Sequence, residues 1–158
     1  MKRTLIVLVL AFTGLLAAAT PASADVTFFL GFSTNPETRP ARGFAGGFNF
    51  LLFGFEFDYA NTSADEAIDA PNLKTGMING LIMTPTKHSL YLTLGGGFYK
   101  ETSLAGSVTS FGTNIGGGVK ISLIGPVQVR VDYRIFNLRG DARFAHPQRF
   151  YTGLNLRF

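Results

Sequence analysis

The chain has 158 residues, a formal net charge of +4 and no cysteine. Without cysteine it can be neither a disulfide-stabilised scaffold nor a thiolate metal site. The charge falls to +2 once residues 1–24, which hold two of the 14 basic residues and no acidic one, are set aside, and so small a charge excludes a nucleic-acid footprint.

Residues 1–24 have the pattern of a secretory signal peptide. The basic pair Lys2-Arg3 precedes an apolar stretch, and Ala22-Ser23-Ala24 is a small-x-small cleavage site. An uncleaved anchor helix is the alternative, but the apolar stretch is shorter than the roughly 20 residues that a span needs. We therefore expect export, cleavage and a mature chain of one domain over residues 25–158.

The mature chain alternates between apolar and polar residues in eight segments, and this period of two predicts β-strands. The clearest segment is Phe53-Gly54-Phe55-Glu56-Phe57-Asp58-Tyr59. The fourth segment is the least regular, and Asn79 indicates that its odd-numbered positions face inward. The predicted strands cover residues 25–32, 43–51, 53–60, 73–83, 89–99, 109–122, 127–136 and 150–158.

The connections between these strands alternate in length. The short ones lie near Leu52, at 84–88 and at 124–126. The long, polar ones lie at 33–42, 60–72, 100–108 and 137–149. Outer-membrane barrels have short periplasmic turns and longer external loops, so both ends of the mature chain are expected on the periplasmic side.

The two faces of the predicted strands differ in polarity. One face is almost entirely Phe, Leu, Val, Ile and Tyr, which in water would form a very large adhesive patch but is the normal surface toward lipid. The other face holds Gly, Asn, Thr and most strand charges, which suit the crowded interior of an eight-stranded barrel. The sequence therefore predicts an all-β, eight-stranded, antiparallel, transmembrane up-and-down β-barrel.

Four motifs stand out in the strands: Leu94-Gly95-Gly96-Gly97-Phe98, Ile115-Gly116-Gly117-Gly118-Val119-Lys120, Val131-Asp132-Tyr133-Arg134 and the terminal Leu156-Arg157-Phe158. Together with the alternating strands, they resemble the small bacterial outer-membrane barrels, a group that includes the OmpA membrane domain, OmpX and OmpW. The resemblance covers essentially all of residues 25–158. It implies insertion into the outer membrane by the barrel-assembly machinery, while the roles within this group are diverse.

Two sets of charged residues are candidates for function. Because a buried charge without a partner is costly, we expect the inward charges to pair across the barrel and close it, in a lumen charge network of Glu56, Asp58, Lys120, Arg130, Asp132 and Arg134. A channel lining is the alternative reading of the same residues. Five arginines near the external loops are candidates for lipopolysaccharide phosphates, or are ordinary solvated charges: Arg39, Arg42, Arg139, Arg143 and Arg149.

The remaining motifs favour structural interpretations. The glycine triplets lie within strands, where they allow close packing, and not in the strand–helix turn of a phosphate loop. His88 and Ser89 are strand neighbours that point to opposite faces, and His146 with Asp141 has no matching serine. The acidic loop from Asp65 to Asp69 lacks EF-hand spacing, so we expect no metal and no cofactor.

We therefore expect a non-enzymatic barrel that has a structural or surface-interaction role, with its lumen closed by paired charges. A narrow passive channel, or an OmpW-like path for small apolar molecules, is the alternative. A lipid A-modifying enzyme is a third hypothesis. The sequence leaves the ligand, the adhesion partner and the oligomeric state open.

Overall fold

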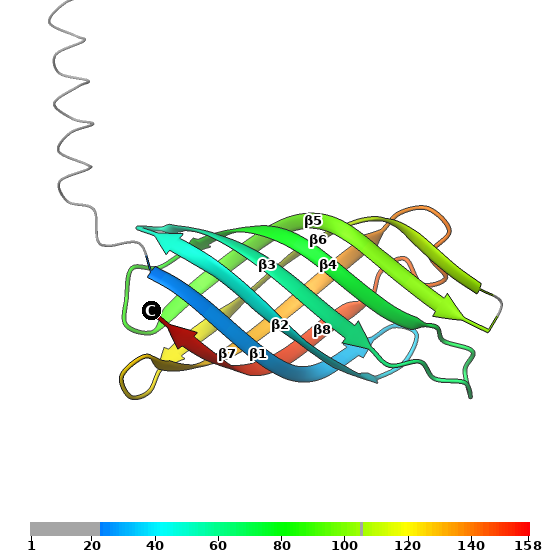
Figure 1. The fold of residues 1–158 in the computed structure, drawn as a ribbon, viewed down its shortest axis with the longest axis horizontal. Coiled ribbons are helices and arrows are strands. Elements are labelled where there is room, and N and C mark those ends of the chain that lie inside the picture. Colours follow the sequence, from blue (N-terminus) through cyan, green and yellow to red (C-terminus); the bar gives the residue numbers. More distant parts are fainter. Residues whose placement is uncertain (1–22, 105) are drawn as a thin grey trace, which may run out of the picture.

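The computed structural model describes residues 23–104 and 106–158, which form a closed barrel of eight antiparallel strands (Figure 1). Each strand pairs with its neighbours in sequence, and β1 pairs with β8 to close the ring. No helix among these residues is long and apolar enough to span a membrane. The predicted fold class is confirmed. The strands are β1 (Ser23–Thr34), β2 (Arg39–Phe50), β3 (Phe53–Thr62), β4 (Asn72–Met83), β5 (Ser89–Ser103), β6 (Gly106–Ser122), β7 (Val127–Leu138) and β8 (Gln148–Arg157).

The alternation of residue types sets the two faces of the wall. Apolar side chains stand outward, as at Phe28 and Leu92, which are 61% and 70% exposed. The intervening residues point into the barrel and are buried. In β4 the odd-numbered positions face inward, as Asn79 indicated: Leu73, Thr75, Met77, Asn79 and Leu81 are all buried. An apolar exterior around a charged interior is the arrangement of a membrane-spanning barrel.

The strands are longer than the sequence predicted, mainly at the end with the long connections. The predicted loop at 100–108 is mostly strand, because β5 and β6 stay paired up to Ser103 and Gly106. At the other end β1 begins at Ser23, which pairs with Asn49. Apart from Ser23 and Ala24, the predicted signal peptide lies outside the described residues.

The two ends of the barrel differ in their connections. The short turns, the start of β1 and the C-terminal end of β8 lie together at one end, and the longer loops lie at the other (Figure 1). The loop between β3 and β4 is tied down from inside, because Arg39 Nη1 donates to the Pro71 carbonyl at 2.6 Å and to the Ser63 carbonyl at 3.3 Å.

Candidate functional site in the barrel interior

The middle of the barrel interior is occupied by an arginine–carboxylate cluster. Arg130 extends from β7 to Glu56 on β3, where its guanidinium makes a two-point contact, one arm of it at 3.1 Å. Arg134, also on β7, donates from Nη2 to the same carboxylate at 2.8 Å. Strands β3 and β7 are four places apart in the ring, so these contacts cross the lumen.

Asp132 balances the second positive charge of this cluster. Its carboxylate accepts from Arg134 Nε at 2.9 Å and from Arg130 Nη2 at 3.0 Å. It also accepts from the hydroxyl of Tyr91, which in turn accepts from Arg130 Nε at 2.7 Å. We call Glu56, Tyr91, Arg130, Asp132 and Arg134 the central cluster. With two carboxylates and two guanidiniums, it is electrically neutral.

Glycine makes room for Tyr91 in this cluster. Gly118 lies directly opposite Tyr91 in the β5–β6 register, and a Cβ at Gly118 would lie 2.5 Å from the Tyr91 hydroxyl oxygen. A Cβ there would also clash with the backbone carbonyl of Val131. Gly118 is therefore a packing feature that leaves room for the tyrosine side chain beside the wall.

Two members of the predicted lumen charge network pair outside the central cluster. Lys120 contacts Asp25 at 2.6 Å, nearer the short-turn end, and Asn49 donates to the same carboxylate at 2.7 Å. Asp58 accepts from Arg149 at 2.7 Å, nearer the loop end, and is 3.8 Å from Arg134. The predicted network grouped Lys120 with Glu56 and Asp58. The structure corrects this grouping, because β1 places Asp25 closer to Lys120.

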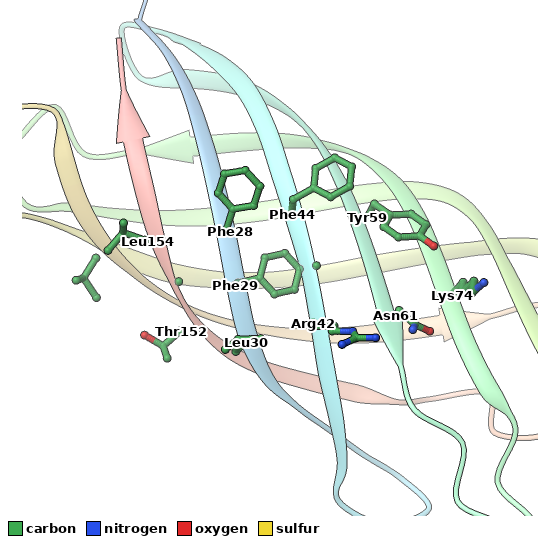
Figure 2. A pocket seen from close by; sticks show the side chains of 13 residues that line it. Phe28, Phe29, Leu30, Arg42, Phe44, Tyr59, Asn61, Lys74, Thr152 and Leu154 are labelled. Carbon is green, nitrogen blue, oxygen red and sulfur yellow. The ribbon is translucent and has the colours of Figure 1, made fainter.

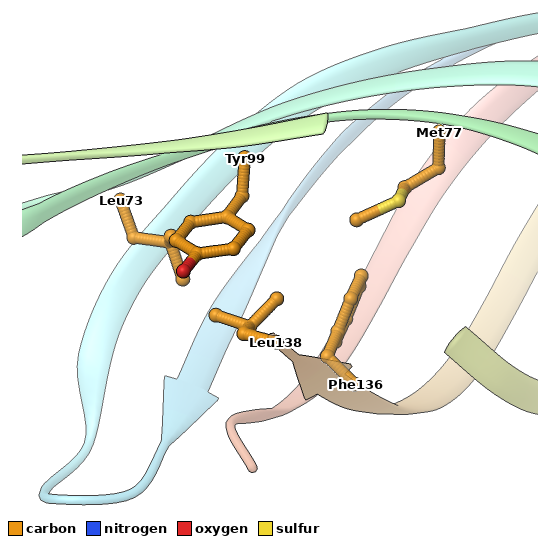
Figure 3. Close-up of a cluster of buried hydrophobic side chains, with 5 residues drawn as sticks. All are labelled: Leu73, Met77, Tyr99, Phe136 and Leu138. Atoms are coloured by element: carbon orange, nitrogen blue, oxygen red, sulfur yellow. The ribbon is translucent and has the colours of Figure 1, made fainter. Parts of the chain in front are cut away.

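An apolar cluster lies on the β4, β5 and β7 side of the interior, toward the loops. Tyr99 packs there with side chains from β4 and β7, and its hydroxyl donates to the Arg139 carbonyl at 2.6 Å (Figure 3). The packed cluster consists of Leu73, Met77, Tyr99, Phe136 and Leu138. At the opposite end, a cavity of about 220 Å³ opens beside Asp25 and Lys120. The interior thus has paired charges in its middle and a polar vestibule at the short turns. Its loop side has an apolar cluster on one wall, and Arg39 and Glu101 are also buried at that end.

The five arginines expected at lipopolysaccharide divide into two groups. Arg39 and Arg149 are 3% and 2% exposed and point inward, so the expectation that they contact lipopolysaccharide is wrong. Their strand parity explains this, since β2 and β8 turn these odd positions toward the lumen. Arg42, Arg139 and Arg143 are exposed. Of these, Arg143 forms an ion pair with Asp69 at 2.6 Å that links two loops.

Besides Arg39, sequence reasoning missed several interior groups for which a signal was present. Asp25, Tyr91 and Arg149 all occupy inward positions of their strands. The alternation of inward and outward positions along each strand is enough to place these three side chains inside the barrel. We overlooked Asp25 because it stands at the predicted cleavage site, and Arg149 because it was assigned to a loop that is strand in the structure.

Both histidines lie in exposed segments of the described chain. Ser89 Oγ donates to the Thr86 carbonyl at 2.8 Å, within an exposed turn that also holds His88. His146 is exposed, and its backbone carbonyl accepts from Asn35 at 2.9 Å. Over 23–104 and 106–158, no group of three or more His, Asp or Glu residues could hold a metal ion.

The fold is shared with solved bacterial membrane proteins. Neither a family model nor a curated protein matches the sequence. Neisserial surface protein A superimposes with a TM-score of 0.65 at 16% identity, covering 89% of this chain and 99% of that one.

Two further barrels are similar. The N-terminal β-barrel domain of Pseudomonas aeruginosa OprF gives a TM-score of 0.68 at 14% identity over 86% of this chain and 97% of that one. Ail, the attachment invasion locus protein of Yersinia pestis, gives 0.52 at 16% identity over 87% and 97%. These likenesses concern the fold, and they agree with the apolar exterior and charged interior described above. The chain is therefore a transmembrane β-barrel with the fold of the small eight-stranded bacterial outer-membrane proteins.

Proposed function

We propose that this outer-membrane barrel is a non-conducting membrane insert that presents its loops at the cell surface, in a structural or surface-interaction role. The central cluster is the observation that carries the proposal. Arg130 and Arg134 reach across the lumen to Glu56, so the charges occupy the space that a conducting path would need. The interior of an eight-stranded barrel is just wide enough for side chains to fill it.

The apolar cluster around Tyr99 supports the same role, because it fills part of the lumen between the paired charges and the loops. The vestibule at the short-turn end is a blind recess under this proposal. The loops beyond β3 and β7, joined by Arg143 and Asp69, form the surface available to a partner.

Single-channel recording on the refolded protein in a planar bilayer tests the proposal. The wild-type barrel should show no unitary conductance, and liposomes that contain it should not swell in small sugars. Steady unitary currents in the wild type would overturn the proposal in favour of a narrow channel. Uptake of small apolar molecules without ion current would favour a lateral path through the wall, as in OmpW-like barrels.

The enzymatic alternative has its own test. If the barrel modified lipid A, incubation with lipopolysaccharide would release fatty acid or change the mass of lipid A. We expect no change, because neither histidine is hydrogen-bonded to a serine that could act as nucleophile among the described contacts.

Insertion through the barrel-assembly machinery belongs to the same proposal, and depletion of that machinery should leave the chain unfolded in the periplasm.

A further inference from the structure

The outward face of the strands carries charge at only three places among the described residues, and all three are basic. They are Arg42 on β2, Lys74 on β4 and Lys100 on β5. Every Asp and Glu within a strand points inward, so no outward carboxylate neutralises these cations. The three belong to one hydrogen-bonded row: Arg42 pairs with Asn61, Asn61 with Lys74, and Lys74 with Lys100.

We call Arg42, Asn61, Lys74 and Lys100 the cationic row. Asn61 adds a hydrogen-bond donor to its three cations. Its side-chain oxygen already accepts from Asn72 Nδ2 at 2.8 Å, so its amide nitrogen is the group it can offer to a ligand. Arg42 and Lys74 flank Asn61 on strands that are about 10 Å apart, a gap that two long side chains can close around one anion. The cationic row therefore presents donors and positive charge without an acceptor of its own.

An apolar groove begins directly beside the cationic row. Arg42, Asn61 and Lys74 share a surface concavity of about 810 Å³ with apolar side chains of β1, β2 and β8 (Figure 2). Figure 2 shows Phe28 and Phe44 on the side of the row toward the short turns, and Leu30 level with Arg42. The apolar residues that line the groove include Phe28, Leu30, Phe44, Val129 and Leu154.

The height of the cationic row in the wall places it at one membrane interface. The next residues toward the short turns are aromatic, with Phe44 against Tyr59 and Phe98 against Phe111. Aromatic girdles mark the edges of the apolar band in transmembrane barrels. The row lies on the loop side of this girdle, so it meets the headgroups of the outer leaflet, while the groove faces that leaflet's acyl chains.

We propose that the cationic row and the groove together form a site for a phosphorylated, acylated lipid of the outer leaflet, the chemistry of lipid A. Its phosphate would lie between Arg42 and Lys74 with Asn61 donating, and one acyl chain would lie along Phe28 and Phe44. Charge-assisted hydrogen bonds from arginine and lysine suit a phosphate, and the apolar groove suits a chain. The inference rests on the proposed outer-membrane placement, with the loops outside.

Native mass spectrometry of the refolded barrel released from detergent tests this site. Lipid A and its dephosphorylated form are added at equal concentrations. The wild type should retain lipid A about tenfold more strongly, since charge-assisted hydrogen bonds are the strong ones. The double variant Arg42→Gln with Lys74→Gln should lose this preference. Lys87→Gln with Arg157→Gln removes the same charge at the short-turn end and should keep it.

A second variant separates the groove from the charges. Thr152 lines the groove, and Thr152→Phe would fill it while leaving the cationic row intact. It should weaken retention of lipid A without increasing retention of the dephosphorylated form. Competition by inorganic phosphate alone would show that the site takes free phosphate and not a lipid, which would overturn the proposal.

Equal retention of both lipids by the wild type, or full preference in the double variant, would also overturn it. An unheated gel shift checks that each variant folds. A wild-type barrel that folds but shows no preference would refute the lipid site alone, whereas failure to insert into bilayers would refute the membrane role on which it rests.

Discussion

The inward and outward faces of the barrel wall carry charge in opposite ways. Inside, both signs occur and each guanidinium of the central cluster contacts a carboxylate, as Arg130 does with Glu56. Outside, the strands carry only cations, and Arg42 and Lys74 make no ion pair among the described residues. A desolvated charge needs a partner, whereas a charge at the headgroup level keeps water or a lipid anion. Strand parity and height thus decide whether a charge stabilises the fold or is free to bind a ligand.

Among the predicted changes, removing the Glu56 carboxylate should lower the stability of the barrel the most. Glu56→Ala leaves Asp132 as the one carboxylate that contacts both Arg130 and Arg134, and breaking a buried pair costs about 3–5 kcal/mol. Urea unfolding of the barrel in detergent micelles, followed by the gel shift, measures this loss. Adding Arg130→Ala should recover part of it in a double-mutant cycle. Additive effects of the two changes would contradict the pairing.

A charge placed on the lipid face should come next. Phe55 is 56% exposed on the outward side of β3, so Phe55→Arg should destabilise the inserted barrel by about 2–4 kcal/mol. Phe55→Leu keeps the position apolar and should have a much smaller effect. Folding titrations into lipid vesicles give both values. Equal losses would mean that this face does not meet lipid.

The inward and outward faces should also differ in the stability that a glycine-to-alanine substitution costs. Gly118→Ala should cost about 1–3 kcal/mol, because its Cβ would meet Tyr91 and the Val131 carbonyl inside the wall. Gly80 faces outward, and the nearest atom to a Cβ there is the Leu94 carbonyl oxygen at 3.9 Å, so Gly80→Ala should be nearly neutral. The same unfolding measurement compares the two. A neutral Gly118→Ala would show that the central cluster packs more loosely.

The loop-side ion pair should give the smallest effect. Arg143 and Asp69 are both well exposed, and exposed pairs contribute about 0–1 kcal/mol, so Arg143→Ala should hardly change stability. Arg39→Ala removes a buried donor from the Pro71 and Ser63 carbonyls, and leaving them unpaired should cost about 1–3 kcal/mol. Limited proteolysis of the loop at 63–71 should detect the second change and not the first.

The alternation of residue types made the strands and their faces predictable, even in β4, where inward Asn79 follows outward Ile78. It also located Glu56, Arg130 and Arg134 on the inside, since charge on the other face would meet lipid. The partners of Lys120 and Asp58 were not predictable in the same way. They depend on the stagger between distant strands, which brings Asp25 and Arg149 to those heights.

The strand ends were the least predictable feature. Loop composition suggested polar connections from 100 to 108, yet serine and threonine also suit strands that stand in water above a membrane. The ladder between β5 and β6 therefore continues to Ser103 and Gly106. The sequence did not suggest that Lys74 and Lys100 belong to one site, because each by itself resembles an ordinary solvated lysine at the end of a strand. Only the pairing register shows that they adjoin Asn61 and Arg42.

The seam between β1 and β8 has a consequence for biogenesis. Asp25 pairs with Arg157 and Val26 with Leu156, so most of the described residues lie between the two strands of this seam. Contacts so distant in sequence make folding slow, and the ring cannot shut before the final residues are translated and delivered. Until then β1 and β7 each expose an unpaired edge, the kind of surface on which chains aggregate. A stop codon just before Gln148 would give a chain of seven strands in which β1 and β7 keep unpaired edges. We expect such a chain to be degraded by proteases and not inserted into the membrane.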